Sequence, residues 1–145
     1  MEIHELIDEW EREGAIDRTD IGESVAKNPQ LHAAWWRHFC RERTALQDQK
    51  KELSQLRHAK HNFYAYGPTR ETQLLGWAYP VVGKILKTEV ERYVDNDPHV
   101  VAKAREVSLQ QEKVDFCEST IKSLKDRGFA CRTAIDWHKF TSGEG

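Results

Sequence analysis

Residues 29–65 read PQLHAAWWRHFCRERTALQDQKKELSQLRHAKHNFYA, and Asn28 before them provides a helix cap, with Pro29 in the first turn, where its missing N–H costs nothing. The apolar residues recur at helical spacing and form one ladder: Leu31, Trp35, Phe39, Leu46, Leu53, Leu56 and Phe63. Two intervening seam positions, Glu42 and Gln49, on either side of Leu46, are polar. A stripe this narrow on a helix of about 55 Å cannot serve a globular core, so the pattern predicts a helical hairpin or a coiled-coil seam.

A second long helix is predicted at 98–127. It opens at Asp97-Pro98, where a capping side chain again precedes a first-turn proline. Its seam consists of Val100, Ala104, Val107, Val114, Cys117, Ile121 and Leu124, interrupted by Gln111. Arg127-Gly128 is typical of a helix C-terminus, because glycine readily adopts the left-handed cap. A separate last short helix is therefore expected within 130–139.

Short helices are expected around the two long ones. Residues 2–13 place apolar side chains at helical spacing and end at Gly14, and Thr19 or Asp20 can cap another helix that stops before Pro29. Glycines and prolines make the connection at 67–97 irregular, with short helices at 69–75 and 88–94. We predict an all-α chain with a single domain at 1–145. Its segments are acidic N-terminal helices (1–28), a long basic helix (29–66), the irregular connection (67–97), and a long helix with a short C-terminal one (98–145).

Charge is unevenly distributed along the chain, although the net charge is only -2. Residues 1–28 carry nine acidic side chains against three basic ones, whereas residues 37–61 carry seven basic side chains against three acidic ones, and three histidines besides. This asymmetry indicates head-to-tail self-association or a polyanionic partner for the basic part. The mean hydropathy of -0.77 is low for a monomer that must bury its own core, so we expect the subunit to complete its core by assembly.

Composition also excludes several classes of protein. No apolar run is long enough to span a membrane. The three cysteines contain no CxxC pair, which argues against a disulfide framework or a structural zinc site and fits a reducing compartment. No phosphate-binding loop, dinucleotide-binding turn or nucleophile elbow occurs, so we predict no catalytic residue, no cofactor and no enzyme.

The end of the first long helix is the most informative candidate site. Its cations and aromatic rings suit single-stranded nucleic acid, because cations follow phosphates and rings stack on unpaired bases. The predicted contacts are Lys50, Lys51, Arg57, His58, Lys60, His61 and Tyr64. The alternative is a solvated face on which Phe63 and Tyr66 anchor the following loop. A metal shared by His58 and His61 is disfavoured, because no acidic or cysteine neighbour follows at a further helical turn.

Two adjacent tryptophans, Trp35 and Trp36, point about 100° apart on a helix, so separate partners must cover them. Trp36 needs either the N-terminal helix of its own chain or another subunit, and we favour another subunit. Trp10, Trp35 and Trp36 are therefore predicted to form an oligomer interface. In it, the acidic helix would dock on a neighbour's Arg37 and Arg41.

Five stretches of the sequence together carry a family resemblance. They are residues 112–129 (EKVDFCESTIKSLKDRGF), residues 134–143 (AIDWHKFTSG), Gly76-Trp77, residues 85–90 (ILKTEV) and Asp97-Pro98. These stretches resemble the UvsY family of phage recombination mediators. The resemblance follows the whole chain in order. The family's DNA-binding motif, a basic stretch before paired tyrosines and a glycine, is similar to Arg57-His58-Ala59-Lys60 before Phe63-Tyr64. In that frame His58 and Lys60 take the two basic positions, with histidine where the family has lysine and the glycine one residue later.

The resemblance implies an all-helical subunit of an open ring, with seven copies expected. It implies that the protein binds single-stranded DNA, contacts the phage single-strand-binding protein and a RecA-like phage recombinase, and helps to load the recombinase in the cytoplasm of the infected host. It would serve recombination and recombination-dependent replication and repair. The segments at 67–97 and 129–145 are equal candidates for the protein contacts.

Two other functions remain open from the residues alone. A structural helical oligomer or scaffold would use the basic face only against acidic proteins. A sequence-specific duplex binder is disfavoured, because no tight helix-turn-helix pair is present.

Overall fold

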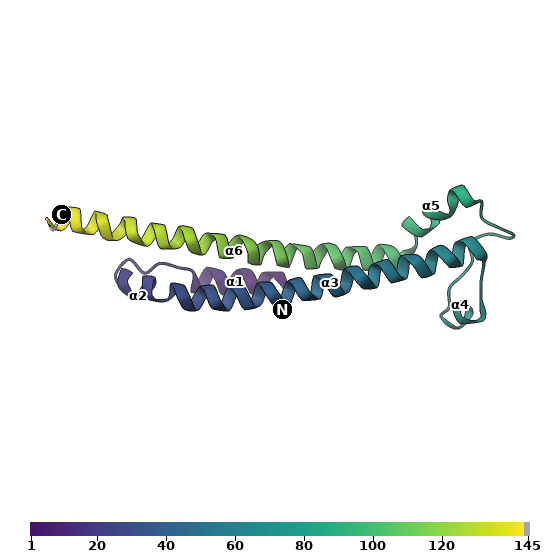
Figure 1. Cartoon of the computed structure of the whole chain (residues 1–145), viewed down its shortest axis with the longest axis horizontal. Coiled ribbons are helices and arrows are strands. Elements are labelled where there is room, and N and C mark those ends of the chain that lie inside the picture. Colours follow the sequence, from purple (N-terminus) through teal and green to yellow (C-terminus); the bar gives the residue numbers. More distant parts are fainter. Residues whose placement is uncertain (144–145) are drawn as a thin grey trace. The chain divides into compact units, whose positions relative to one another are not determined.

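A computed structural model describes residues 1–143, and the last two residues of the predicted 98–145 segment lie outside the described residues. The regular elements in this part of the chain are all helical, which confirms the predicted all-α class (Figure 1). They are α1 (Ile3–Glu13), α2 (Ile21–Ala26), α3 (Asn28–Tyr66), α4 (Arg70–Leu74), the 3₁₀ turn η1 (Lys87–Glu89), α5 (Val90–Asp95) and α6 (Pro98–Ser142). None of the described helices combines the length and the apolar character needed to cross a bilayer.

Helix α3 begins and ends within a residue of the predicted limits. Pro29 lies in its first turn, as expected. At the other end Gly67 adopts a φ of +92°, which side-chain-bearing residues rarely do, and its N–H donates to the carbonyl of Phe63 at 2.9 Å. The chain can therefore turn sharply where the sequence changes from helical spacing to Gly67-Pro68.

Helix α6 corrects the prediction of a helix end at Arg127-Gly128 and of a separate short helix after it. One helix of 45 residues continues through both positions to Ser142. The Arg127 side chain is buried, and it donates to the carbonyls of Gly14 at 3.0 Å and Ser24 at 2.6 Å. A glycine inside a helix costs only about 1 kcal/mol relative to alanine, so these tertiary bonds outweigh it.

The chain divides into two compact units, and both long helices run through both. Unit 1 comprises Met1–Thr44 and the chain from Gln110 onward, and unit 2 comprises Ala45–Leu109. The core of unit 1 consists of Leu6, Leu31, Trp35, Cys117 and Leu124, flanked by Trp10, Phe39, Phe116 and Ile121. In this unit α1 packs against its own chain's α3 and α6 (Figure 1).

The packing of unit 1 corrects part of the predicted oligomer interface. Trp35 has no exposed surface, and Trp10 contacts it edge-on at 5.9 Å between ring centroids, so both serve the core of their own unit. Helix α1 also lies on its own α3, where Glu9 pairs with His38 at 3.1 Å. The expected docking of α1 on a neighbour's Arg37 and Arg41 is therefore not supported. Trp36 remains about half exposed, and its ring stacks on that of Phe39 with the centroids 5.1 Å apart.

A polar pair, Glu42 of α3 and Gln110 of α6, interrupts the apolar seam of unit 1. The sequence predicted Glu42 at this point of α3, but it predicted Gln111, one residue later, on α6. Glu42 is buried, and Gln110 donates to its carboxylate at 2.7 Å and to its backbone carbonyl at 2.9 Å. Gln111, predicted to break the seam, is half-buried and donates to Asp115 at 2.9 Å. Buried polar groups require hydrogen-bond partners. Glu42 finds its partner in Gln110, so Gln110 and not Gln111 faces the seam.

The core of unit 2 lies where the connection returns to the long helices. It consists of Tyr64, Ile85, Val90, Val94 and Val100. Tyr79 donates from its hydroxyl to the backbone carbonyl of Tyr64 at 3.1 Å, which holds the irregular segment against the end of α3. The predicted short helices at 69–75 and 88–94 are confirmed as α4 and as η1 with α5.

Candidate nucleic-acid interface

The C-terminal half of α3, in unit 2, carries all seven residues that we predicted to bind nucleic acid. The structure separates them into three groups by burial and partner. Lys60 and Tyr64 are buried, Arg57 and His61 contact carboxylates at the surface, and Lys50, Lys51 and His58 are exposed.

Lys60 and Tyr64 converge on the carboxylate of Asp97. The ammonium of Lys60 lies 3.1 Å from Oδ2 of Asp97, and the hydroxyl of Tyr64 donates to the same oxygen at 2.5 Å. The ammonium also lies 2.8 Å from Nδ1 of His99 and 3.7 Å from the centroid of the Trp77 ring. Only 3% of the Lys60 side chain and 3% of the Asp97 side chain are exposed. This placement corrects the expected positions of Lys60 and Tyr64 on an open surface, because a carboxylate from the start of α6 holds both inside.

Asp97 also caps α6. Its Oδ1 accepts from the backbone N–H of His99 at 2.9 Å and of Val100 at 3.2 Å. Burial raises the pKa of Asp97, but the hydrogen bonds from Tyr64 and Lys60 outweigh burial and hold the pKa below its ordinary value. Burial and the bond to Asp97 raise the pKa of Tyr64. The carboxylate therefore stays charged and joins the end of α3 to the start of α6.

Arg57 and His61 lie on one stripe of α3 and face α5. Arg57 donates to Asp95 at 2.6 Å and to Glu91 at 3.5 Å, and Nδ1 of His61 lies 3.1 Å from Glu91. All four side chains are more than one-third exposed. Exposed ion pairs of this kind contribute about 1 kcal/mol or less, so a phosphate can compete for these cations.

The exposed group follows a neighbouring stripe of α3. Lys51, His58 and Asn62 are spaced by seven and four residues, which places them along one side of a helix. The amide nitrogen of Asn62 lies 3.4 Å from Nε2 of His58, and Lys50 is exposed beside Lys51. The two lysines offer cations to a phosphate backbone without the loss of an ion pair that the described residues show, and His58 and Asn62 offer polar groups beyond them.

The sequence interpretation missed what lies at the end of this stripe. Asn62 borders a hollow of about 430 Å³, lined on α3 also by Phe63 and Tyr66 and completed by the α4 segment and Trp77. The alternative interpretation had Tyr66 anchor the following loop, yet 85% of it is exposed. The available signal was the Tyr66-Gly67-Pro68 turn, which ends the helix and leaves the last ring without cover.

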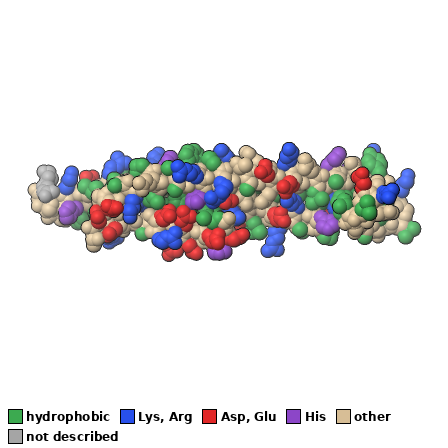
Figure 2. All heavy atoms as spheres, turned by 90° about the horizontal axis from the view of Figure 1, so that it is seen from below, with side chains coloured by type: hydrophobic (Ala, Val, Ile, Leu, Met, Phe, Trp, Pro, Cys, Tyr) green, Lys and Arg blue, Asp and Glu red, His purple; other side chains and the backbone are tan. Residues whose placement is uncertain are grey.

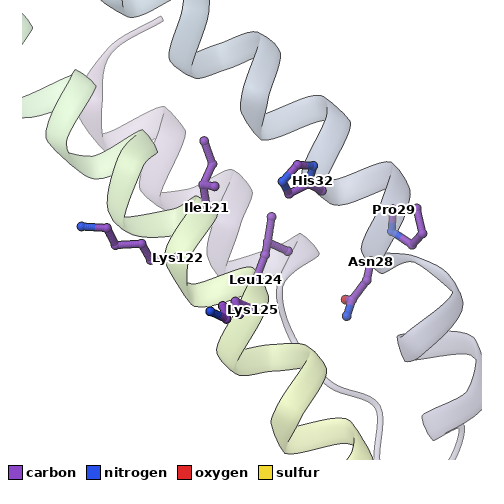
Figure 3. A pocket seen from close by; sticks show the side chains of 7 residues that line it. All are labelled: Asn28, Pro29, His32, Ile121, Lys122, Leu124 and Lys125. Atoms are coloured by element: carbon purple, nitrogen blue, oxygen red, sulfur yellow. The ribbon is translucent and has the colours of Figure 1, made fainter.

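Unit 1 presents a different surface. Figure 2 shows acidic side chains gathered on the face that carries α1, where Glu2, Glu5, Asp8 and Glu11 are exposed. A separate hollow between α3 and α6 is predominantly apolar. In Figure 3, Ile121 and Leu124 of α6 lie opposite His32 of α3, with Lys122 and Lys125 at the edge. Neither feature suits a phosphate backbone as well as the stripe of unit 2 does.

The last turns of α6 expose an aromatic stripe. The exposed fractions of Phe129, Trp137 and Phe140 are 67%, 66% and 73%. Trp137 and Phe140 stack with their ring centroids 5.8 Å apart. Contiguous exposed rings of this kind are typical of a protein-protein contact.

Comparison with proteins of known structure identifies the fold. The crystal structure of the bacteriophage T4 recombination mediator protein UvsY in lattice type II matches with a TM-score of 0.83 and 18% identity, over 98% of this chain and 98% of that chain. The structure in lattice type IV matches with a TM-score of 0.80 and 18% identity, over 97% of this chain and 99% of that chain. The structure in lattice type I matches with a TM-score of 0.80 and 19% identity, over 94% of this chain and 98% of that chain. At this identity the likeness shows a shared fold. No curated protein sequence gives a significant match.

A sequence-family model extends the comparison beyond the fold. The model described as "Recombination, repair and ssDNA binding protein UvsY" matches residues 9–144, which is nearly the whole chain. This match confirms the resemblance found in the sequence. The chain belongs to the UvsY family.

Proposed function

We propose that this chain is a single-stranded-DNA-binding recombination mediator. It would help to load a RecA-like phage recombinase onto DNA covered by the phage single-strand-binding protein, without catalysing a reaction and without a metal or cofactor. The observation that carries the proposal is the group of exposed residues Lys50, Lys51 and His58 on α3, followed at the end of the helix by the exposed ring of Tyr66. The chain also belongs to a family described as ssDNA-binding. The site of action would be the cytoplasm of the infected bacterial host.

We also propose that the protein acts as a homo-oligomeric ring, with seven subunits expected from the family resemblance. Exposed Trp36 and the aromatic stripe of Phe129, Trp137 and Phe140 support self-association, because water-exposed rings gain free energy when a partner covers them. A ring repeats a weak DNA site many times on one particle. Binding should then be tight and dependent on strand length, although a single site is weak.

The first prediction concerns the exposed cations. Lys50→Glu/Lys51→Glu should weaken binding to oligo-dT by at least about tenfold at low salt, because two phosphate contacts are lost and two repulsive charges are added. The slope of log affinity against log salt should become shallower by about 0.7 for each lost contact. Fluorescence anisotropy at several salt concentrations measures both quantities, and light scattering checks that the oligomer is unchanged.

The matched control is Lys122→Glu/Lys125→Glu, which changes charge equally on exposed residues of unit 1. It should leave binding within about twofold. Equal losses in the two variants would show that overall charge, not the α3 stripe, governs binding. Wild-type protein that stays oligomeric but binds no DNA at low salt would favour the alternative, a structural helical oligomer or scaffold.

The second prediction concerns the carboxylates of α5. Glu91 and Asp95 contact Arg57 and His61, and these carboxylates compete with DNA phosphates for the two side chains. The variant Glu91→Gln/Asp95→Asn should therefore bind oligo-dT about three- to tenfold more tightly. The same titration measures this gain. Asp8→Asn/Glu11→Gln on α1 removes two exposed acids from unit 1 and controls for net charge. Unchanged affinity in the α5 variant would mean that Arg57 and His61 do not meet DNA.

A further inference from the structure

We propose that the hollow between the end of α3 and α4 holds one unstacked nucleobase of the bound strand. This inference rests on the proposed DNA-binding function and assigns it a base-binding site. The site would add to the phosphate contacts a stacking interaction that depends on the base and not on the backbone charge.

Local backbone geometry builds the hollow. The positive φ of Gly67, +92°, turns the chain away from α3, and Thr69 caps α4 by accepting from the N–H of Thr72 at 3.3 Å. The positive φ of Gly76, +75°, then reverses the chain, and the N–H of Trp77 donates to the carbonyl of Thr72 at 3.1 Å. Trp77 thereby returns to the side of α3 that carries Phe63 and Tyr66.

Neighbouring side chains hold the rings of one wall of the hollow in position. The ring of Trp77 contacts that of Phe63 edge-on, with the centroids 5.5 Å apart, and the Lys60 ammonium lies 3.7 Å from the centroid of the Trp77 ring. Lys60 is in turn held by Asp97. Tyr66, by contrast, is exposed, so its ring gains cover when a flat apolar group lies against it. A preorganised wall and an uncovered ring suit a planar ligand.

The chemistry of the lining favours a base over a phosphate. Among the described residues that line it, the charged one is the acid Glu71 and none is a lysine or arginine, so the lining itself disfavours an anion. Asn62 supplies an amide with both donors and an acceptor, which suits the edge of a base. The volume of about 430 Å³ lies within the range of small-ligand sites.

The position of the hollow fits a strand that follows the cation stripe. Lys51, His58 and Asn62 lead along α3 towards Tyr66, and Asn62 belongs both to the stripe and to the lining. Phosphates can therefore pass Lys51 and His58 while a base turns into the hollow. Such a contact would hold that base out of the stack.

The test compares oligo-dT with a strand of the same length made of abasic sites, which has the same phosphates and no bases. Wild-type protein should bind oligo-dT at least about fivefold more tightly at fixed salt. Tyr66→Ala should reduce this preference without changing the affinity for the abasic strand. Tyr66→Phe keeps the ring and should retain the preference.

The control is Leu74→Ala, which removes an exposed side chain from α4 outside the hollow and should keep the preference. Equal wild-type affinity for the two strands, or a Tyr66→Ala loss that is equal on both, would overturn the base site but leave DNA binding intact. If the wild type binds neither strand, the proposed function fails and this inference fails with it.

Discussion

The variant Asp97→Asn is expected to lower the free energy of unfolding by about 3–5 kcal/mol, because it leaves the buried Lys60 ammonium without its counter-charge. Asparagine has nearly the volume of aspartate and can still cap α6, so the loss reports the charge and not a cavity. The ammonium would keep His99 and the rings of Trp77 and Phe63 as neighbours, none of which carries a compensating negative charge. Urea or thermal unfolding at fixed protein concentration measures the loss, and the melting temperature should fall by roughly 10 °C.

Two further variants separate charge from packing. Asp95→Asn makes the same chemical change two residues earlier, in an exposed ion pair with Arg57, and should cost about 1 kcal/mol or less. Lys60→Met in the Asp97→Asn background removes the unpaired ammonium and should recover a large part of the lost stability. Equal effects of Asp97→Asn and Asp95→Asn would show that the buried pair does not support the fold.

The pH dependence of this effect has a defined sign. The pKa of Asp97 is lowered in the folded state, so its stabilisation is present above the ordinary aspartate pKa and is lost as the pH falls through the lowered value. The stability difference between wild type and Asp97→Asn should therefore be constant from about pH 5 to pH 8 and shrink only below about pH 4.

The long helices could be predicted from the sequence because their signals are local. Asn28-Pro29 and Gly67-Pro68 enclose α3, and Asp97-Pro98 opens α6, so capping and chain stiffness alone give these limits. The same holds for α2, whose Asp20 cap accepts from the N–H of Glu23 at 3.1 Å. Local signals failed at Gly128, where the deciding contacts come from residues about 100 positions away in the sequence.

The sequence predicted which helix carries the candidate residues but not how each of them is buried or paired. Helical spacing puts the cations on the end of α3, yet it cannot show that Asp97, 37 residues after Lys60, takes that side chain into the core. A charged residue on a helix is ordinarily solvated, and only a long-range partner reverses this expectation. For the same reason, Lys60→Glu would not test DNA binding alone, since it would also break a buried ion pair.

Substitution of Arg127 is the second change from which we expect a large loss of stability. The side chain is buried, and it donates to the carbonyls of Gly14, Ala15 and Ser24 and to the amide oxygen of Asn28. Arg127→Met should lower the free energy of unfolding of unit 1 by about 3–5 kcal/mol, because four acceptors lose a charged donor while the helix keeps a side chain of similar length. Arg127→Lys should be intermediate, since one ammonium cannot span acceptors that the planar guanidinium reaches together.

Hydrogen exchange localises this effect. Amides of residues 14–28 should lose protection first in Arg127→Met, because this segment is held to α6 by the arginine. Arg132→Met removes an exposed arginine from the next turns of the same helix and should change stability by about 0.5 kcal/mol or less. Uniform loss of protection across the chain would contradict a local clamp.

The variant Arg127→Met also tests whether unit 1 serves assembly while unit 2 binds DNA. The proposed DNA contacts, Lys50, Lys51 and His58, belong to unit 2, whereas Arg127 belongs to unit 1. If unit 1 serves assembly, Arg127→Met should reduce oligomer size and the tight binding of long strands. Binding of a strand short enough for one subunit should stay within about twofold, because avidity is lost but the site is not. Equal losses on short and long strands would instead mean that unit 1 takes part in the DNA contact itself.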